Sequence, residues 1–356
     1  MCEANKILIE RLEGWYAQHA RTLPWRDTRD AYRIWVSEII LQQTRVAQGY
    51  DYYLRFIERF PDVRALAEVQ EDEVMKYWQG LGYYSRARNM HAAARDVMER
   101  FGGSFPSTYN DIRSLKGVGD YTAAAIASIA YDLPHAVVDG NVYRVLSRLF
   151  DVDMPIDTGA GKRYFNELAH TLLHRDSPGL YNQALMEFGA LQCLPVGSKC
   201  DACPLQDMCA AHATHVVDKR PVKQGKVSMK SRFFYYFVLS CNGHTWLQRR
   251  EGNDIWRNLY EFPLIELDRA MDWEELRRTE PFAKLFDGMG QITFEGVPFT
   301  AKHVLTHRII HATFYKVKVD TPPASLSHLT SIAVNEVQRY AVSRLTERFL
   351  QHDADE

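Results

Sequence analysis

The sequence lacks several features that would assign a protein to a class at once. No apolar run approaches the ~20 residues that a membrane-spanning helix needs, and no internal repeat or low-complexity tract is present. Positive charge is not in excess either, because 43 lysines and arginines are balanced by 45 acidic residues, a formal net charge of -2. Any surface that binds a polyanion must therefore be a local patch offset by acidic surface elsewhere.

Cysteine is scarce, and most of it is confined to one short segment. The chain has six cysteines, of which only Cys2 and Cys241 lie outside residues 193–209. The start of the sequence lacks a cationic segment followed by an apolar run, so we expect an intracellular, cytoplasmic protein. A reducing compartment disfavours disulfides, and a metal site is therefore the favoured interpretation of the clustered thiols.

Four thiolates in so short a span can close a compact loop around a zinc ion or an iron–sulfur cluster. The candidate ligands are Cys193, Cys200, Cys203 and Cys209. Zinc sites usually contain two short CxxC pairs or add histidines, whereas only Cys200 and Cys203 are paired in this way. His212 and His215 follow closely, either as further ligands or as ordinary polar residues. The ligand types alone leave both metals open.

The hydrophobic pattern predicts two domains. Residues 1–217 are expected to be helical with no strand, and the helices are predicted at 7–19, 30–48, 62–78, 85–101, 121–131, 141–150, 162–174 and 181–192. Residues 218–230 are polar and lysine-rich, which is typical of an exposed linker. Residues 231–356 are expected to be α+β, with strands at 232–239, 245–248, 291–294 and 311–319 and helices at 272–278 and 334–350.

Glu38 is the first candidate catalytic residue, because it interrupts an apolar helix face. A carboxylate in that position needs either a partner or a function. Partial burial would raise its pKa, which is what a general acid working near neutrality requires. The alternative is an internal salt bridge to Arg33 or Arg45.

A glycine turn and a second acid follow later in the chain. Gly117 and Gly119 allow positive φ and present backbone N–H groups at a helix N-terminus, where they can bind a phosphate. The alternative is a plain helix–helix connection, although the small residues of 123–125 also allow a second helix to approach closely. Asp139 ends an apolar run before a predicted helix, and as an isolated residue it would be read as an N-cap.

Four segments together resemble one known family. Residues 33–48, 80–89, 115–146 and 193–209 are similar to the MutY adenine DNA glycosylases of the endonuclease III superfamily, and the match extends over about residues 6–345. The resemblance implies a helix-hairpin-helix glycosylase domain with a [4Fe–4S] cluster on the four clustered cysteines. It also implies a monomer that removes adenine opposite 8-oxoguanine, or more weakly opposite guanine, in duplex DNA, at the nucleoid in a bacterium.

The resemblance assigns catalytic roles. Glu38 would protonate the adenine, which leaves poorly as an anion, and Asp139 would stabilise the oxocarbenium-like sugar. Asn141, in the same segment as Asp139, is also expected to belong to the catalytic centre. Tyr121 stands where bifunctional relatives carry a lysine that attacks the sugar and nicks the strand. The resemblance therefore implies a monofunctional enzyme that acts on a flipped base.

The resemblance also assigns binding roles. The adenine pocket would be formed by Trp25, Arg26, Leu41, Val46 and Gln183. Trp25, Leu41 and Val46 are equally good core residues. Contacts with the DNA would come from Gln43, Thr44, Tyr83, Gly117 and Gly119. Among these, Gln43, Thr44 and Tyr83 would enter the base stack.

The C-terminal part resembles a Nudix-type fold, which introduces a rival function as a phosphohydrolase. Residues 273–278 lack the glycine and the later acidic pair of the Nudix metal-binding helix, so recognition is favoured over hydrolysis. MutY enzymes use such a domain to check for 8-oxoguanine. Their Phe-Ser-His loop corresponds here to Leu305, Thr306 and His307, so a hydroxyl and an imidazole are kept. Two competing functions remain for the whole chain, a pyrimidine-specific glycosylase and a non-enzymatic iron–sulfur DNA-binding sensor.

Overall fold

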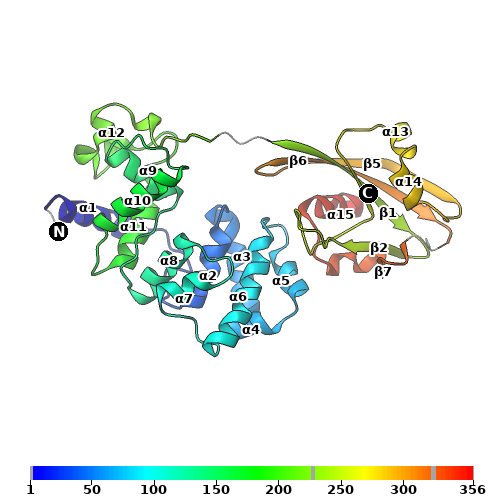
Figure 1. Cartoon of the computed structure of the whole chain (residues 1–356), viewed down its shortest axis with the longest axis horizontal. Helices are drawn as coiled ribbons and strands as arrows, with labels where there is room; N and C mark the ends of the chain where they lie inside the picture. Colours follow the sequence, from blue (N-terminus) through cyan, green and yellow to red (C-terminus); the bar gives the residue numbers. More distant parts are fainter. Residues whose placement is uncertain (1–2, 226–228, 322–325, 356) are drawn as a thin grey trace. The chain divides into compact units, whose positions relative to one another are not determined.

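The computed structural model describes residues 3–225, 229–321 and 326–355 (Figure 1). The chain divides into two compact units by its internal contacts. Unit 1 comprises Met1–Glu68 and Asn89–Gly225, and unit 2 comprises Val69–Arg88 and Lys226–Glu356. The expected division of the chain, at 217 and 231, remains a prediction. Residues 218–225 do pack within unit 1, since the Ile156 N–H donates to the Val222 carbonyl at 3.0 Å.

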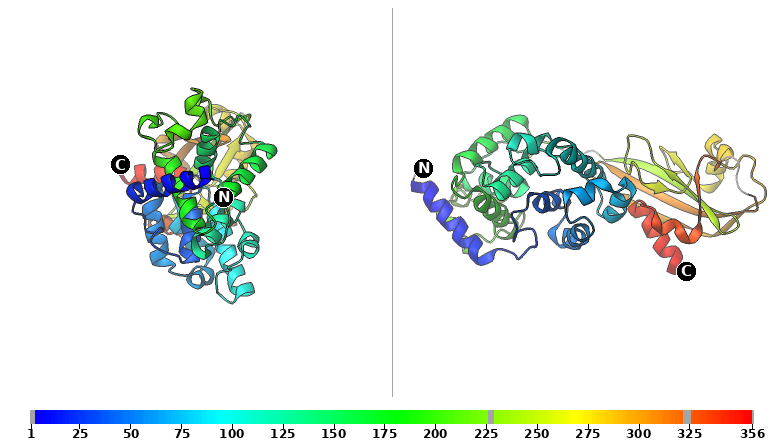
Figure 2. Two further views of the ribbon diagram at one scale, coloured as in Figure 1. Left: turned by 90° about the vertical axis from the view of Figure 1, so that its left-hand side faces the viewer. Right: turned by 90° about the horizontal axis from the view of Figure 1, so that it is seen from below.

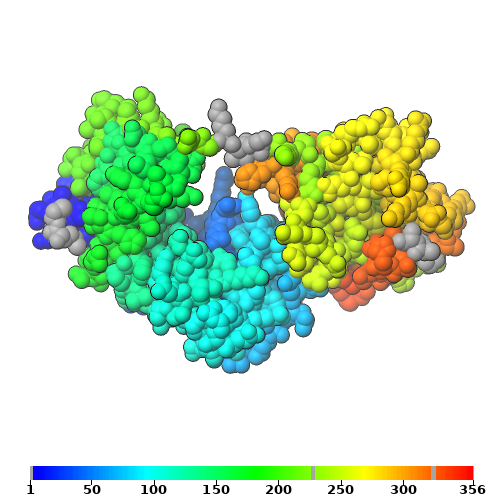
Figure 3. Space-filling model, viewed as in Figure 1, coloured from blue at the N-terminus to red at the C-terminus, as the bar shows by residue number. Residues whose placement is uncertain are grey.

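Unit 1 is built from helices and contains no strand within its described residues. Its helices begin with α1 (Glu3–His19), α2 (Ala31–Leu41), α3 (Val46–Arg59), α4 (Val63–Glu68), α6 (Ser85–Phe101, of which residues 85–88 count to unit 2) and α7 (Tyr109–Ser114). They continue with α8 (Asp120–Tyr131), α9 (Gly140–Leu149), α10 (Gly159–Leu172), α11 (Pro178–Leu191), η1 (Cys200–Ala202), η2 (Gln206–Met208), α12 (Ala210–Ala213) and η3 (Val217–Lys219). Figure 3 shows their side chains forming a continuous surface on the face in view.

Two predicted helices are each divided in the structure. The helix expected over 30–48 is α2 and α3 with a turn between them, in which Gln43 has a left-handed φ of 56°. The helix expected over 62–78 is likewise α4 and α5 (Glu71–Trp78), interrupted before Gln70, whose backbone is extended. No glycine or proline marks either break, so local sequence signals did not reveal them.

The close approach of α8 and α11 positions the centre of unit 1. A Cβ added at Gly179 of α11 would lie 2.6 Å from the Ser128 carbonyl oxygen of α8, so only glycine fits there. Next to it, the buried Asn182 donates to Ser128 Oγ at 2.9 Å and to the His135 carbonyl at 2.8 Å, and accepts from the Val137 N–H at 3.1 Å. These contacts fix the extended segment that leads to Asp139.

Within its described residues, unit 2 contains two sheets. The larger has the order β4-β1-β6-β5, with β1 and β6 parallel and the other pairs antiparallel; the smaller has the order β3-β2-β7. Figure 2 draws the strands as arrows in two further views. The strands are β1 (Lys230–Ser240), β2 (His244–Arg249), β3 (Tyr260–Glu261), β4 (Leu264–Leu267), β5 (Ile292–Val304), β6 (Arg308–Val319) and β7 (Thr330–Ala333). The helices besides α5 are α13 (Trp273–Arg277), α14 (Glu280–Leu285), η5 (Val334–Arg339) and α15 (Arg344–Asp355).

Aromatic packing holds the helices of unit 2 onto the larger sheet. Phe349 of α15 stacks on Phe314 of β6 with ring centroids 4.6 Å apart, and Phe282 of α14 meets Phe237 of β1 edge to face. The helix expected over 334–350 is in fact η5 followed by the start of α15. Strand β5 is much longer than the expected 291–294. Its later residues are mostly exposed and mix polar with apolar types, so they give no apolar run.

Candidate active site

A cavity of about 580 Å³ lies in unit 1 between α2, α8, α11, the start of α9 and residues 21–26. The residues expected to form the catalytic centre and the base pocket all line it: Trp25, Arg26, Glu38, Leu41, Val46, Tyr121, Asp139, Asn141 and Gln183. They come from distant parts of the sequence. The structure therefore brings together the nine side chains that the sequence reasoning grouped.

Glu38 is buried in this cavity, with 8% of its surface exposed. The hydroxyl of Tyr121 donates to Glu38 Oε2 at 2.7 Å, so the partner of the carboxyl group is a phenol rather than Arg33 or Arg45. Burial raises the pKa of Glu38 to about 7, helped by the charge of Asp139 and opposed by the Tyr121 hydrogen bond. Glu38 can therefore carry a proton near neutral pH and release it.

Tyr121 lies in the first turn of α8 and is half-buried beside Glu38. Burial, together with the nearby Glu38 and Asp139, raises the pKa of its hydroxyl well above the ordinary value. The hydroxyl consequently stays protonated and acts as a donor. A phenol held in this state orients the Glu38 carboxyl group and offers no amine nucleophile.

Asp139 is the N-cap of α9, as its pattern alone indicated, and it also lines the cavity, while its catalytic role stays a prediction. Its Oδ1 accepts from the Val142 N–H at 2.7 Å and its Oδ2 from the Asn141 side-chain amide at 2.8 Å. Burial raises the pKa of Asp139, while these two hydrogen bonds oppose the shift by favouring the ionised form. The helix N-terminus adds a further favourable field for the anion.

Glu187 and Arg21 line the cavity and were missed by the sequence reasoning. Glu187 accepts paired hydrogen bonds from Arg21 at 2.8 and 2.5 Å and from Arg26 at 2.9 and 2.6 Å. Burial alone would raise the pKa of Glu187, but the two guanidinium groups outweigh it and lower the pKa to about 2. The available signal was its position on α11 four residues after Gln183, which places both on one helix face.

The other pocket residues also contribute to packing. Trp25 is almost fully buried and meets Tyr53 edge to face at 5.1 Å between ring centroids. Gln183 accepts a hydrogen bond from the Tyr16 hydroxyl at 3.0 Å. Leu41 and Val46 flank the turn between α2 and α3 and are half-buried. Core and pocket are thus continuous at these positions.

The two glycines of the turn before α8 adopt different backbone conformations. Gly117 has a φ of +80°, and a Cβ there would lie 2.7 Å from Cβ of Asn89, so glycine is required. Gly119 instead has a φ of −93° and is the N-cap of α8, so of the two glycines only Gly117 uses the positive φ that glycine allows. Both glycines border a second cavity of about 510 Å³ that Lys162 also lines.

Comparison with known proteins gives this geometry a family. The model described as "HhH-GPD superfamily base excision DNA repair protein" matches residues 36–169, and a NUDIX domain model matches residues 235–352. The adenine DNA glycosylase of Buchnera aphidicola subsp. Baizongia pistaciae is 33% identical over 281 residues, which cover 77% of this chain and 78% of that protein. The chain belongs to the adenine DNA glycosylase family.

Relatives and solved structures agree with this assignment. The adenine DNA glycosylase of Rattus norvegicus is 43% identical over 226 residues, 61% of this chain and 42% of the rat protein. A thermostable thymine-DNA glycosylase structure covers 59% of this chain and 97% of its own, with a TM-score of 0.55 and 29% identity. An endonuclease III–DNA complex, at 19% identity and a TM-score of 0.52, shows the same fold over 60% of this chain and 99% of its own. The chain is accordingly a DNA glycosylase of base excision repair, a hydrolase of N-glycosyl bonds.

The cysteine loop of this glycosylase surrounds a small, largely apolar cavity. Cys193, Cys200, Cys203 and Cys209 all line it. Arg148 lies beside them, and its Nη1 donates to Cys193 Sγ at 3.4 Å and to the Leu194 carbonyl at 2.6 Å. His212 and His215 are absent from the described lining, and within the described residues no three ligand-type side chains converge on a single point.

A further pocket, of about 440 Å³, lies within unit 2 of the glycosylase. Tyr83, Trp256, Thr306, His307 and Arg308 are among its lining residues. Tyr83 is 48% exposed with a left-handed φ of 47°, and its hydroxyl lies 2.7 Å from Thr306 Oγ1.

Among the described helices of the chain, none is long and apolar enough to cross a membrane.

Proposed function

We propose that this glycosylase removes adenine opposite 8-oxoguanine, and more weakly opposite guanine, from duplex DNA and leaves an abasic site. The observation that carries the proposal is the pair of carboxyl groups in one cavity of unit 1. Glu38, with a pKa of about 7, is a proton donor at neutral pH, and Asp139 is an anion fixed at a helix N-terminus. A donor and an anion are the two groups that hydrolysis of an adenine nucleoside needs.

The chemistry begins with a base turned out of the duplex, because neither carboxyl group can reach a stacked base. Glu38, oriented by the Tyr121 hydroxyl, gives its proton to a ring nitrogen of the adenine, which then departs as a neutral base. Asp139 stabilises the positive charge that develops on the sugar. Trp25, Arg26, Leu41, Val46 and Gln183 enclose the base, and the Arg26–Glu187 pair holds polar groups at a fixed place in that wall.

Tyr121 favours a monofunctional reaction. It occupies the position in α8 that faces Glu38, and its phenol carries no amine to form a Schiff base with the sugar. Cleavage of the DNA strand at the abasic site then requires a separate treatment, such as alkali. Asn141 supports the release of the base, because its side-chain amide donates to Asp139 and holds that carboxylate in place.

Contacts with DNA are assigned to exposed and backbone groups. Gln43 and Thr44 lie in the turn between α2 and α3, and Gln43 is exposed with a left-handed backbone, which suits insertion between bases. Tyr83 has an equally exposed ring on a left-handed turn. Gly117 and Gly119 precede α8, where free N–H groups can bind a phosphate. Duplex DNA is therefore the proposed partner.

Thr306 and His307 are proposed to read the base opposite the adenine. Both are exposed and line the same pocket of unit 2 as Tyr83. A hydroxyl and an imidazole provide the donors and acceptors that distinguish 8-oxoguanine from guanine. The replacement of the family's aromatic residue by Leu305 leaves these polar groups in place.

The four clustered cysteines are proposed to hold a [4Fe–4S] cluster. Four thiols around one cavity form a suitable donor set, and the guanidinium of Arg148 compensates the charge of an anionic cluster. The spacing of these cysteines, which resembles that of the family's [4Fe–4S] loop, favours the cluster over a single zinc ion. The proposed contribution of the group is to stabilise the loop.

A single-turnover excision assay tests the proposed function. The protein is incubated with duplexes that carry A opposite 8-oxoguanine, A opposite G, or T opposite G, and abasic sites are then cleaved with alkali. We expect alkali-dependent cleavage at the adenine, fastest opposite 8-oxoguanine. Release of thymine alone would support a pyrimidine-specific enzyme, and binding without release of any base would support a DNA sensor.

Glu38→Gln is the matched variant for this assay. It keeps the shape of the side chain but has no proton to give, so excision should fall by about a hundredfold or more. Duplex binding, measured by fluorescence anisotropy, should be retained. Equal loss of binding and excision would instead assign Glu38 a structural role.

A further inference from the structure

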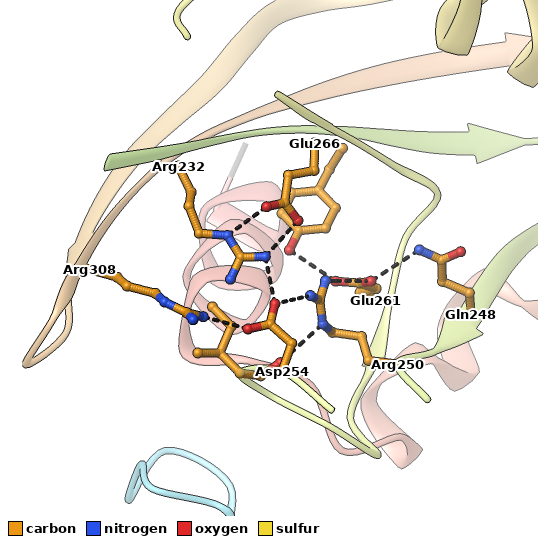
Figure 4. Close-up of polar contacts among 9 residues, drawn as sticks. Arg232, Gln248, Arg250, Asp254, Glu261, Glu266 and Arg308 are labelled. Carbon is orange, nitrogen blue, oxygen red and sulfur yellow. Dashed lines mark hydrogen bonds and ion pairs between the residues drawn. The ribbon is translucent and has the colours of Figure 1, made fainter. Parts of the chain in front are cut away.

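A carboxylate that the proposed reaction does not use lies at the centre of three arginines in unit 2. Asp254, in the segment between β2 and β3, accepts from Arg232 of β1 at 2.5 Å and from Arg250 at 3.3 Å (Figure 4). It also accepts from Arg308, the first residue of β6. These arginines come from three different parts of the chain, so Asp254 joins elements that the sequence separates.

The three arginines are not equivalent. Arg232 has a second acidic partner in Glu266, with contacts of 2.6 and 2.7 Å, and Arg250 has one in Glu261, with two contacts of 2.9 Å. Among the described ion pairs, Arg308 is bound to Asp254 alone. Burial would raise the pKa of Asp254, but the hydrogen bonds from Arg232 and Arg308 hold it well below its usual range. Asp254 is therefore charged across the whole physiological range.

Arg308 closes the turn that carries Thr306 and His307. Its carbonyl accepts the Leu305 N–H at 2.8 Å, and the Lys230 N–H donates to the His307 carbonyl at 3.1 Å. The tip of the turn is exposed. Its backbone is thus held on one side by β1 and its C-terminal end by the bond between the Arg308 side chain and Asp254.

The segment on the other side of Asp254 is itself firmly held. Arg250 Nε donates to the Ile255 carbonyl at 3.2 Å, and the Asn258 N–H donates to the Arg250 carbonyl at 2.7 Å. Trp256 is only 8% exposed and packs edge to face with Phe234 of β1 at 6.0 Å between ring centroids. The Asp254–Arg308 bond therefore attaches an exposed turn to a fixed segment beside the sheet.

We propose that Asp254 is a positioning residue that holds the 305–308 turn in place and thereby sets the preference for 8-oxoguanine over guanine opposite the adenine. This inference rests on the proposed reading of the opposite base by Thr306 and His307. Asp254 touches neither base and acts through Arg308. It makes the polar side chains of the turn available without the ordering cost of a free loop.

Asp254→Asn and Arg308→Gln test the inference in the single-turnover assay with A opposite 8-oxoguanine and A opposite G. Each should reduce the ratio of the two rates by about tenfold, since a charge-assisted bond is lost, while the rate on A opposite G stays within about twofold. The double variant should lose no more than Asp254→Asn alone, because the bond that Arg308→Gln removes is already lost in Asp254→Asn. Thermal unfolding of each variant verifies its fold.

Glu266→Gln is the matched control. Like Asp254→Asn it turns a carboxylate partner of Arg232 into an amide, but it leaves the bond to Arg308 intact. Its rate ratio should stay at the wild-type value. The inference is overturned if Asp254→Asn and Glu266→Gln give the same ratio of the two rates. It is also overturned if the losses of Asp254→Asn and Arg308→Gln add in the double variant. A wild-type protein with no preference for 8-oxoguanine over guanine would remove the proposed function. If that preference is lost in Thr306→Ala but kept in Asp254→Asn and Arg308→Gln, only the proposed role of Asp254 is removed.

Discussion

At the scale of single residues, the apolar helix face around Glu38 singled out that acid, whereas Asp139 alone indicated an N-cap and was placed in the site by the family resemblance. Glu38 interrupts an apolar helix and Asp139 ends an apolar run, and both line the cavity of unit 1. Glu187 could not be found in the same way, since its partners Arg21 and Arg26 are more than 150 residues away and only the fold joins them. Long-range ion pairs leave no local pattern in a sequence.

The pKa of Glu38 predicts the pH dependence of excision. The proposed reaction needs the protonated acid, and the folded-state pKa of Glu38 is about 7, above the ordinary 4.5. The single-turnover rate should therefore be nearly constant below pH 7 and fall by about tenfold per pH unit above it. A rate measured from pH 5.5 to 9 that rises through neutrality would contradict the assignment of Glu38 as the acid.

The same shift has a consequence for stability. Because burial raises the folded-state pKa, the contribution of Glu38 to stability is complete below about pH 4.5 and is lost as the pH rises toward 7. Glu38→Gln avoids burying a charge. Its Tm should therefore exceed that of the wild type at pH 8, and the difference should shrink at pH 5.

Tyr121→Lys tests the reaction class. A lysine at the start of α8 would bring an amine to the cavity that Asp139 lines, where it can attack the sugar. We expect some strand cleavage without alkali and a protein–DNA product trapped by borohydride. Tyr121→Phe serves as the control that removes the hydroxyl without supplying an amine, and it should give neither. No trapped product with Tyr121→Lys, in a protein that still binds duplex, would count against this placement of residue 121.

At the scale of elements, the helices with strong periodicity were predicted and the breaks between them were not. Residues 85–101 and the alanine-rich α8 were found almost to their ends. The division between α2 and α3 was missed because Gln43 adopts a left-handed backbone without being glycine. Tertiary contacts impose such a conformation, and a single sequence carries no record of them.

Glycine in helices offers a paired test of element packing. Gly179→Ala places a methyl group 2.6 Å from the Ser128 carbonyl oxygen, so α8 and α11 must separate. We expect a loss of about 1–3 kcal/mol of unfolding free energy and slower excision, because α11 carries Glu187 and Gln183. Gly14→Ala in α1 meets nothing within 4 Å and should stabilise the protein by about 0.5–1 kcal/mol. Similar urea midpoints for the two variants would refute this account.

At the scale of the whole molecule, the sequence predicted a helical part and an α+β part, and the family comparison agrees. It did not predict that residues 69–88 are grouped with the C-terminal strands in unit 2. Within that unit, Glu71 accepts from the Asn258 side-chain amide at 2.5 Å and Asp72 from the Tyr260 hydroxyl at 3.1 Å. Such contacts join residues almost 190 positions apart and follow no sequence pattern.

The cysteine loop gives a prediction for the intact protein. If it binds an iron–sulfur cluster, the purified glycosylase should be brown, absorb visible light, and contain iron and acid-labile sulfide. Cys200→Ser should lower the iron content and the Tm together, because the ligands also fold the loop. Cys241→Ser is the control, as this thiol lies in β-structure of unit 2. A colourless protein with one equivalent of zinc would show that the cluster is wrong.

Asp139 combines two positions, since one side chain both caps the N-terminus of α9 and lines the cavity proposed to receive the sugar. Asparagine is also a good N-cap, so exchanging the acid for its amide should leave the architecture whole while the turnover stops. The Asp139→Asn variant should therefore bind its lesion without cleaving it, so that the complex with the intact nucleotide can be isolated.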